Sequence, residues 1–293
     1  MASDTLAPAK INLFLHVGAP GTDGYHPLCS LMVFADVGDR VTLQPAQALD
    51  LKVRGPFGGQ LDGEGDNLVL RAARALLAQG QGPQAPVAFT LEKRLPVAAG
   101  LGGGSSDAGA ALRLMREVVG PRLDDSALEA VAASLGADGA ACLWGRPVVA
   151  QGRGERLSPA PGLPVIEAVL VNPGVTVSTP QVYGGYDRGG TFGDINPPPM
   201  PDAFESVEEL AGWLAITRND LEAPAVALTP AIGDVLATLA DEPETLIARM
   251  SGSGATCFAL CLGDVEAESL AERLMAMQPD WWVQRCRLGG PWD

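Results

Sequence analysis

The chain alternates short apolar segments with polar and glycine-rich ones, and the spacing of the apolar positions predicts both strands and helices. Alternating apolar residues predict strands at residues 9–16, 40–43, 49–53, 87–91, 165–171, 256–262 and 282–287. Apolar residues three or four positions apart predict helices at residues 67–78, 108–119, 124–135, 179–186, 206–216, 220–240 (interrupted at Pro224 and Pro230) and 265–277. We also expect a hairpin at residues 148–157 and strand character at residues 140–144. This mixture is typical of an α+β protein.

Lys10 and Asn12 lie on the same face of the strand predicted at residues 9–16, because side chains alternate between the two faces of a strand. The pattern alone favours an amphipathic edge strand with its lysine in solvent. The alternative is that the two polar side chains serve a binding site. The opposite face carries Ala9, Ile11, Leu13 and Leu15.

Residues 95–110 read Leu-Pro-Val-Ala-Ala-Gly-Leu-Gly-Gly-Gly-Ser-Ser-Asp-Ala-Gly-Ala and join a predicted strand to a predicted helix. The glycines in the middle can adopt positive φ angles and let a ligand approach the backbone. We expect Ser105, Ser106 and Asp107 to cap the helix, whose free N–H groups and dipole favour an anion. The segment therefore predicts a phosphate-binding loop. Its glycines are Gly100, Gly102, Gly103 and Gly104.

Two familiar phosphate-binding patterns do not fit this loop. A P-loop requires a lysine and then Ser or Thr after its last glycine, and no lysine follows here. The dinucleotide-binding fingerprint, started at Gly100, requires glycine at the position of Ser105. The remaining alternative is a glycine-rich turn without a ligand. Three consecutive glycines, however, cost backbone entropy that a simple connection would seldom carry.

Three other segments carry candidate functional groups. Tyr25 and His26 lie in a predicted turn and could stack on a base and bind its edge, although such pairs are more often one packed ring and one exposed histidine. Asp138 follows the helix that Gly136 ends, and its carboxylate is either a turn former or a base at the mouth of a cleft. Residues 249–255 are either an ordinary tight turn or a second segment that closes over the ligand.

Composition narrows the class of protein. A chain of 293 residues with 47% hydrophobic residues can bury a large core. Its formal charge of −15, with no run of basic residues, argues against a nucleic-acid partner. The 5 cysteines and 2 histidines lack metal-binding spacing, which indicates reduced thiols rather than a zinc site. The pattern shows neither a secretion signal nor an apolar run of membrane-spanning length, so we expect a cytoplasmic protein with no membrane partner.

Together these segments resemble the GHMP kinases, the superfamily of galactokinase, homoserine kinase and mevalonate kinase. The resemblance rests on residues 8–13, 96–107, 136–138 and 251–255, in this order along almost the whole chain. It implies an α+β, two-domain GHMP kinase fold. A ribosomal-protein-S5-like N-terminal domain would span residues 1–153 and a ferredoxin-like C-terminal domain residues 154–293, with the active site in the cleft between them. It also implies the use of ATP and Mg²⁺.

Shorter matches, at residues 23–26, 66–68 and 219–222, resemble the branch of the superfamily that acts on a cytidine diphosphate-linked methylerythritol in the non-mevalonate isoprenoid pathway. The partners implied are this small molecule, phosphorylated on its tertiary 2-hydroxyl, and ATP. Two alternatives remain open. One is a GHMP kinase for another small alcohol, of the homoserine or mevalonate type, and the other is a nucleotide-binding module without catalysis. We expect a monomer or a weak homodimer.

The resemblance implies roles for individual residues. Asp138 corresponds to the general base, with Lys10 as the cation beside it and Asn12 holding the substrate. Asn67 and Lys93 correspond to residues near the adenosine. The ATP phosphates would be enclosed by Gly100, Leu101, Gly102, Gly103, Gly104, Ser105 and Ser106. The cytosine would be bound by Tyr25, His26, Thr179 and Tyr183.

Two features leave parts of this assignment open. Relatives usually follow Gly-Ala-Asp with Val-Pro and an aromatic residue, whereas residues 139–141 of this chain are Gly-Ala-Ala, which leaves the packing behind Asp138 undetermined. Tyr25 and Tyr183 would enclose the cytosine from two sides, but Tyr186 lies only three residues further on. The resemblance does not indicate which side chains, if any, bind Mg²⁺.

Overall fold

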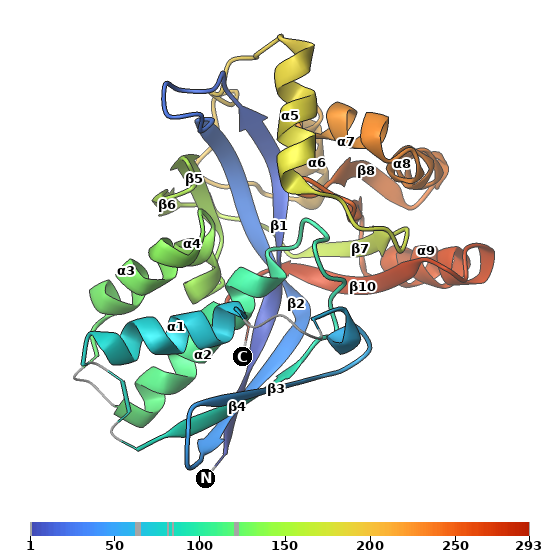
Figure 1. Ribbon diagram of the computed structural model, residues 1–293. Helices are drawn as coiled ribbons and strands as arrows, with labels where there is room; N and C mark the ends of the chain where they lie inside the picture. Colours follow the sequence, from blue (N-terminus) through green and yellow to red (C-terminus); the bar gives the residue numbers. More distant parts are fainter. Residues whose placement is uncertain (1, 62–65, 81, 84, 120–122, 293) are drawn as a thin grey trace.

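Two long antiparallel strands, β1 (Ser3–Val17) and β2 (Leu28–Pro45), run through the middle of the molecule (Figure 1). The computed structural model describes residues 2–61, 66–80, 82, 83, 85–119 and 123–292. β1 is buried without interruption from residue 7 to residue 17. The strand that carries Lys10 and Asn12 is therefore interior on both faces, and its polar side chains need partners or a ligand.

The strands of the described residues form one 10-stranded sheet. The main path runs through β3 (Asp50–Arg54), β4 (Val87–Glu92), β2, β10 (Trp282–Gly289), β7 (Ile166–Asn172), β9 (Cys257–Cys261) and β8 (Thr245–Met250). β1 and the hairpin of β5 (Val148–Gly152) and β6 (Arg156–Pro159) attach to β2 beside this path. Leu288 and Gly289 of β10 pair with Ala35 and Phe34 of β2, so the last strand joins the two halves of the chain.

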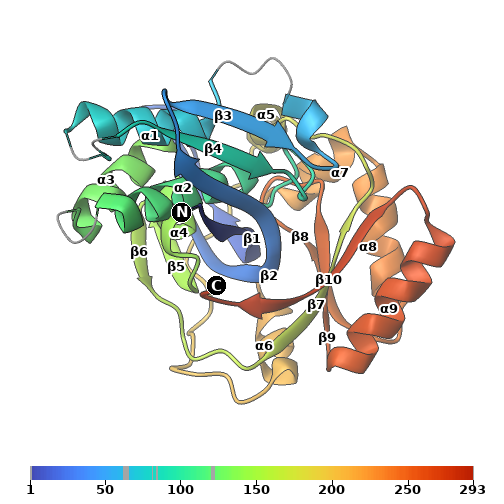
Figure 2. The ribbon, with the colours of Figure 1, turned by 90° about the horizontal axis from the view of Figure 1, so that it is seen from below.

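The C-terminal half has the ferredoxin-like arrangement. Its strands lie in the order β10-β7-β9-β8, and each neighbouring pair is antiparallel. α8 (Ala231–Asp241) precedes β8, and α9 (Asp264–Met277) connects β9 to β10, which gives the β-α-β-β-α-β succession of this fold. Figure 2 shows α8 and α9 side by side along these strands. The remaining helices of this half are α5 (Thr179–Gly189), α6 (Val207–Leu214) and α7 (Glu222–Leu228).

Four helices gather on the N-terminal part of the sheet, at the left of Figure 1. They are α1 (Leu68–Ala78), α2 (Gly103–Val119), α3 (Asp125–Leu135) and α4 (Gly139–Trp144), with the short 3-10 helix Gly58–Leu61 preceding them. α1 and α3 begin where expected, because Asn67 and Asp124 cap them. Each side chain accepts a hydrogen bond of 2.9 Å, from the backbone N–H groups of Val69 and Ala127 respectively.

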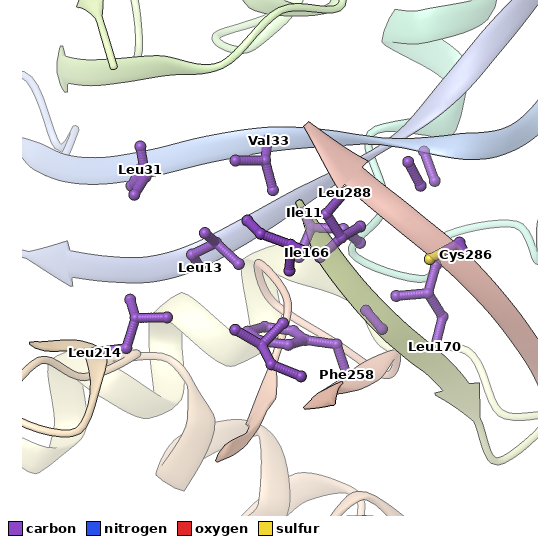
Figure 3. Packing of buried hydrophobic residues seen from close by; sticks show 14 of the residues in the cluster. Ile11, Leu13, Leu31, Val33, Ile166, Leu170, Leu214, Phe258, Cys286 and Leu288 are labelled. Atoms are coloured by element: carbon purple, nitrogen blue, oxygen red, sulfur yellow. The ribbon is translucent and has the colours of Figure 1, made fainter. Parts of the chain in front are cut away.

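A hydrophobic core shared by both halves lies against β1 (Figure 3). Ile11 and Leu13 of β1 contribute to the same buried cluster as Val33 of β2, Phe258 of β9 and Leu288 of β10. Separate clusters fill the space under α1 to α3 and under α7 to α9. Because the shared cluster links strands from both ends of the sequence, its packing sets how the two halves meet at β1.

The prediction of a strand at residues 140–144 is wrong, because these residues form α4. Glycines explain the difference. A Cβ atom on Gly139 would lie 2.0 Å from the carbonyl oxygen of Ala132, and one on Gly109 would lie 2.8 Å from that of Cys142. Both glycines therefore let helices approach each other too closely for any side chain, and an apolar run that reads as a strand packs as a short helix.

The start of α2 also differs from expectation. The helix begins at Gly103 rather than near residue 108, so Ser105, Ser106 and Asp107 lie within its first turns and do not cap it. Elsewhere, Pro224 lies in the first turn of α7, where proline is tolerated, so the break between α7 and α8 comes at Pro230 alone. β8 was not predicted, and the segment 40–43 is the far end of the long β2.

A β-bulge changes which side chains of β1 share a face. The pairing with β2 shifts between Asn12 and Phe14. As a result Phe14 joins Leu13 in the shared core, and Leu15 lines the cavity beside Lys10 and Asn12, contrary to simple alternation.

The predicted domain boundary between residues 153 and 154 remains a prediction, and it falls in the turn that joins β5 to β6. These two strands pair with each other, so the hairpin extends across the boundary. Of the helices in the described residues, none combines the length and apolar character needed to cross a membrane.

Candidate active site

A cavity of about 610 Å³ opens where β1, the start of α2, the loop before α4 and the loop before β9 meet. Its lining includes Lys10 and Asn12 from β1, Asp138 from the loop before α4, and Tyr183 and Ser253 from the C-terminal half. Both glycine-rich segments contribute to its wall. The cavity thus collects most of the residues that the sequence singled out, although they are far apart along the chain.

Close backbone contacts hold the first glycine-rich segment in place. The N–H group of Lys10 donates to the carbonyl oxygen of Leu101 over 2.8 Å, which joins β1 to the loop. Gly100 has a φ angle of 76°, and a Cβ atom there would lie 2.3 Å from the carbonyl oxygen of Ser251. Only glycine fits such an approach. The segments 100–104 and 251–254 therefore interlock and form one wall of the cavity.

Asp138 lies at the start of α4 but does not cap that helix with its side chain in the described structure. Instead its Oδ1 accepts a hydrogen bond of 2.7 Å from the Ser105 hydroxyl. A Cβ atom on Gly102 would lie 3.2 Å from Oδ2 of Asp138 and 3.1 Å from Cε of Lys10. The carboxylate and the lysine therefore flank the same glycine of the loop. This arrangement brings a carboxylate and a cation to the place where the loop would hold a phosphate.

Lys10 is buried, with a relative exposure of 5%, which overturns the interpretation of a lysine in solvent. Its ammonium donates to Oδ1 of Asn12. The Asn12 amide in turn donates to the hydroxyl of Ser30 over 2.7 Å, and the backbone N–H of Asn12 donates to the hydroxyl of Ser251 over 3.2 Å. This network fixes the amide oxygen of Asn12 toward the lysine and orients both side chains at the cavity wall.

Lys93 lies behind the first turn of α2. Its ammonium pairs with the buried carboxylates of Asp39 and Asp107, the latter at 2.8 Å, and a Cβ atom on Gly103 would lie 3.3 Å from its Nζ. Burial disfavours the charge on Lys93, but attraction to the two carboxylates outweighs burial and raises the pKa of the ammonium. Burial raises the pKa of Asp107 to about 8, against the lowering effect of Lys93. Lys93 therefore supports the glycine-rich loop from behind. Its contact with adenosine stays a prediction.

Three further predicted residues have local roles in the structure. Asn67 lines the cavity while its Oδ1 caps α1. Thr179 lines the cavity and shares a hydrogen bond of 2.7 Å with the hydroxyl of Ser253. Ser106 is fully buried and does not contribute to the described lining, and its hydroxyl has no hydrogen-bond partner among the described residues. Ser106 thus supports the loop from inside α2 rather than from the cavity surface.

The aromatic candidates differ in how they relate to the cavity. Tyr183 lines the cavity, whereas Tyr186 is buried and donates its hydroxyl to the carbonyl of Val17. Of these two tyrosines, Tyr183 is therefore the one available to a ligand. Tyr25 is 60% exposed and lies outside the described lining, with the guanidinium of Arg153 over its ring at 4.1 Å from the ring centre.

His26 uses both ring nitrogens within the protein. Its Nδ1 donates to the carbonyl oxygen of Gly18 over 2.8 Å, because a carbonyl only accepts. Its Nε2 faces the carboxylate of Asp187 at 3.2 Å, and its ring centre lies 5.1 Å from that of Tyr183. This geometry makes His26 a support for Tyr183. A contact between its ring and a base edge would require one of these partners to be exchanged.

Sequence reasoning missed two charged residues of the site. Asp107 was expected to be a helix cap, and its partnership with Lys93 depends on a contact between a strand end and a helix that no local pattern shows. Arg153 lies in the turn between β5 and β6 and lines the cavity. A single arginine flanked by glycines, as in Gly-Arg-Gly, was the available signal. It pointed only to a turn.

Two family models match this chain. The model of the GHMP kinases N terminal domain matches residues 67–146, which contain the glycine-rich loop and Asp138, and the model of the GHMP kinases C terminal matches residues 201–279. The chain belongs to the GHMP kinase family. The matched regions supply both glycine-rich walls of the cavity.

Relatives of this GHMP kinase extend over its whole length. It is 64% identical to the 4-diphosphocytidyl-2-C-methyl-D-erythritol kinase of Caulobacter sp. (strain K31), covering 99% of this chain and 100% of the relative. It is 63% identical to the protein of that name from Caulobacter vibrioides (strain NA1000 / CB15N), covering 98% and 100%. A crystal structure of 4-(cytidine 5'-diphospho)-2C-methyl-D-erythritol kinase is similar with a TM-score of 0.78 at 37% identity, covering 99% and 100%. A homoserine kinase structure from Cytophaga hutchinsonii, at 18% identity and a TM-score of 0.69, shares the fold.

The residues of this GHMP kinase fit a triphosphate. The interlocked glycines leave backbone uncovered at the cavity wall, and the first turn of α2 presents free N–H groups that favour an anion. In the described residues, no three or more His, Cys, Asp and Glu side chains cluster as a metal site. This fits Mg²⁺, which proteins often bind through one or two carboxylates together with phosphate oxygens and water. Asp138 is a carboxylate of the described lining beside the loop, with Oδ2 3.2 Å from the position of a Cβ atom on Gly102.

Proposed function

We propose that this GHMP kinase transfers the γ-phosphoryl group of ATP to the tertiary 2-hydroxyl of 4-diphosphocytidyl-2-C-methyl-D-erythritol. The observation that carries the proposal is the placement of Asp138 and Lys10 on either side of Gly102, in a cavity that also reaches Tyr183. The names of relatives that are 63% and 64% identical over nearly the whole chain support this choice of substrate.

Asp138 acts as the general base in this proposal. A tertiary alcohol is a hindered nucleophile, and a carboxylate within reach of its proton assists attack on the γ-phosphorus. The alcohol oxygen forms the new bond to phosphorus, the bond to the ADP oxygen breaks, and the proton passes to Asp138. The hydrogen bond from Ser105 leaves Oδ2 as the oxygen that faces Gly102 and the reacting groups.

Lys10 provides a positive charge beside Asp138, and Asn12 orients the ammonium of Lys10. The ammonium of Lys10 stabilises the charge that collects on the transferred phosphoryl group. Because Lys10 is buried and joined to Asn12, its position is set before substrates bind. Preorganised charge of this kind costs no rearrangement during the reaction. Asn12 would also contact the erythritol part of the substrate.

The glycine-rich loop binds the donor. The backbone N–H groups of residues 100–105 and the N-terminus of α2 would bind the phosphates of ATP, with Ser106 behind them and Asn67 and Lys93 near the adenosine. Mg²⁺, when bound with ATP, neutralises charge on the phosphate oxygens. Lys93 holds the first turn of α2 from behind, so the loop keeps its shape without the ligand.

The cytosine of the acceptor substrate would bind where Tyr183 lines the cavity. Tyr25 and Tyr183 would enclose the cytosine, with His26 and Thr179 beside it. Burial raises the pKa of Tyr183, so its phenol stays neutral and suits stacking on an uncharged base. This part of the cavity distinguishes the proposed substrate from homoserine and mevalonate, which carry no base.

Release of ADP with different acceptors tests the proposal. Purified protein with ATP and Mg²⁺ is given 4-diphosphocytidyl-2-C-methyl-D-erythritol, homoserine or mevalonate, and the product is identified by mass spectrometry. We expect rapid ADP release and a singly phosphorylated product with the first acceptor alone. Equal or greater rates with either of the others would reject this substrate, and ADP release with none of them would indicate a binding module.

A further inference from the structure

Among the described lining residues, Arg153 is the cation whose charge remains accessible. The described lining contains three cationic side chains, Lys10, Lys93 and Arg153. The first two are buried and committed to partners inside the fold. Arg153 is 52% exposed, and its ion-pair partner is the carboxylate of Asp23, which is 51% exposed. Ion pairs between exposed groups contribute little free energy, so this arginine can exchange its partner readily.

The position of Arg153 connects the two ends of the proposed acceptor site. Its guanidinium lies 4.1 Å from the ring centre of Tyr25. The next residue, Gly154, is packed against the segment that carries Asp138, because a Cβ atom on Gly154 would lie 2.8 Å from the carbonyl oxygen of Ala137. The turn between β5 and β6 therefore contacts both Tyr25 and the segment that carries Asp138.

The chemistry of a cytidine diphosphate-linked alcohol matches this order. Such a molecule places its diphosphate between the base and the alcohol. With the cytosine at Tyr25 and the alcohol at Asp138, the diphosphate would lie at the turn that carries Arg153. The chain as a whole has a formal charge of −15, which repels a diphosphate unless a local cation offsets the repulsion.

We infer that Arg153 binds the diphosphate of the acceptor substrate and exchanges Asp23 for it. This inference rests on the proposed function. The planar guanidinium offers several N–H donors in a fork that suits phosphate oxygens, and such charge-assisted hydrogen bonds are stronger than neutral ones. Arg153 then distinguishes diphosphate-linked acceptors from simple alcohols, a selection that the glycine-rich loop cannot make.

Binding of cytidine and CDP separates this role from support of the Tyr25 ring. Calorimetry on wild type, Arg153→Met and Arg156→Met needs no turnover. Arg156 is the matched control, because it lies on the same hairpin, is exposed and does not contribute to the described lining. We expect Arg153→Met to weaken CDP binding roughly 10- to 100-fold, as loss of a charge-assisted contact does, with a small change for cytidine. Arg156→Met should bind both ligands as wild type does.

Three results would overturn the inference. The first is an unchanged CDP affinity in Arg153→Met. The second is an equal loss of cytidine and CDP affinity, which would indicate that Arg153 only supports the ring of Tyr25. The third is a loss of ADP affinity, which would place Arg153 at the ATP site. Turnover of the wild type with the diphosphocytidyl acceptor tests the proposed function separately. In an active enzyme, Arg153→Met should raise KM for the acceptor and leave KM for ATP unchanged.

Discussion

The hydroxyl of Ser105 donates a hydrogen bond of 2.7 Å to Oδ1 of Asp138, and this contact joins the glycine-rich loop to the candidate base. Ser105 belongs to the first turns of α2, and Asp138 directly precedes α4. The two helices approach so closely at Gly109 that a Cβ atom there would lie 2.8 Å from the carbonyl oxygen of Cys142. Helix packing therefore sets the distance between the base and the loop.

Replacing Asp138 with asparagine should remove most turnover. The amide keeps the shape of the side chain but cannot accept the proton of the alcohol. We expect kcat to fall on the order of 10²- to 10⁴-fold, with CDP and ADP affinities close to those of wild type. Asp125→Asn is the control, since this carboxylate belongs to an exposed ion pair with Arg116. A near-normal kcat of the Asp138→Asn variant in steady-state kinetics would show that Asp138 is not the general base.

Replacing Gly100 with alanine should damage both the loop and the fold. The new Cβ atom would lie 2.3 Å from the carbonyl oxygen of Ser251 at a φ angle of 76°, so the two glycine-rich segments would have to separate. We expect loss of ADP binding and a destabilisation of roughly 1 to 3 kcal/mol in urea unfolding. Gly212→Ala in α6 is the control, because open space surrounds its Cβ position, and it should stabilise by about 0.5 to 1 kcal/mol. Normal ADP affinity in the Gly100 variant would contradict the interlocked loops.

Much of the site was predictable from local sequence. Gly100, Gly102, Gly103 and Gly104 indicated an open loop at the start of a helix, and the position of Asn67 before an apolar run indicated the start of α1. Both depend on the backbone conformation of a few neighbouring residues, which the sequence encodes directly. The pairing of Lys10 with Asn12 on one face likewise follows from strand alternation.

The remaining features depend on contacts between distant segments. Local pattern favoured an exposed Lys10, but β1 is buried because elements from both halves cover it. A bulge beside Asn12, not visible in the alternation, moved Leu15 toward the cavity. The strand predicted at residues 140–144 is α4, since close helix approach at glycines outweighed the apolar run. Arg153 has no local signal because its role depends on which loop it faces.

The buried trio of Lys93, Asp39 and Asp107 should make stability depend on pH. Burial raises the pKa of Asp107 from its ordinary 3.8 to about 8. Between these values the folded chain holds a proton that the unfolded chain releases, so the contribution of this group to the free energy of unfolding is full at low pH and falls as pH rises through the window. Asp107→Asn, a neutral substitute for the protonated acid, should flatten this slope.

Urea unfolding of wild type and Asp107→Asn at about pH 5 and about pH 8 measures the difference in slope. Lys93→Met is the contrasting variant. It leaves the buried Asp39 carboxylate without a cation and removes the ion-pair partner of Asp107, and we expect it to cost about 3 to 5 kcal/mol of stability. Equal slopes for wild type and Asp107→Asn would show that Asp107 is ionised throughout the window.

Replacing Tyr25 with alanine should weaken acceptor binding without affecting ATP. Its ring is exposed and carries Arg153 on one face, so its loss removes a stacking surface and leaves the core intact. We expect CDP and cytidine affinities to fall by about 1 to 3 kcal/mol in calorimetry, the usual contribution of a base stack, with ADP affinity unchanged. Tyr186→Phe provides the comparison, because its hydroxyl bonds to Val17 inside the core and its loss should lower stability but not CDP affinity. The reverse result, with CDP binding sensitive to Tyr186 and indifferent to Tyr25, would move the cytosine away from the ring of Tyr25.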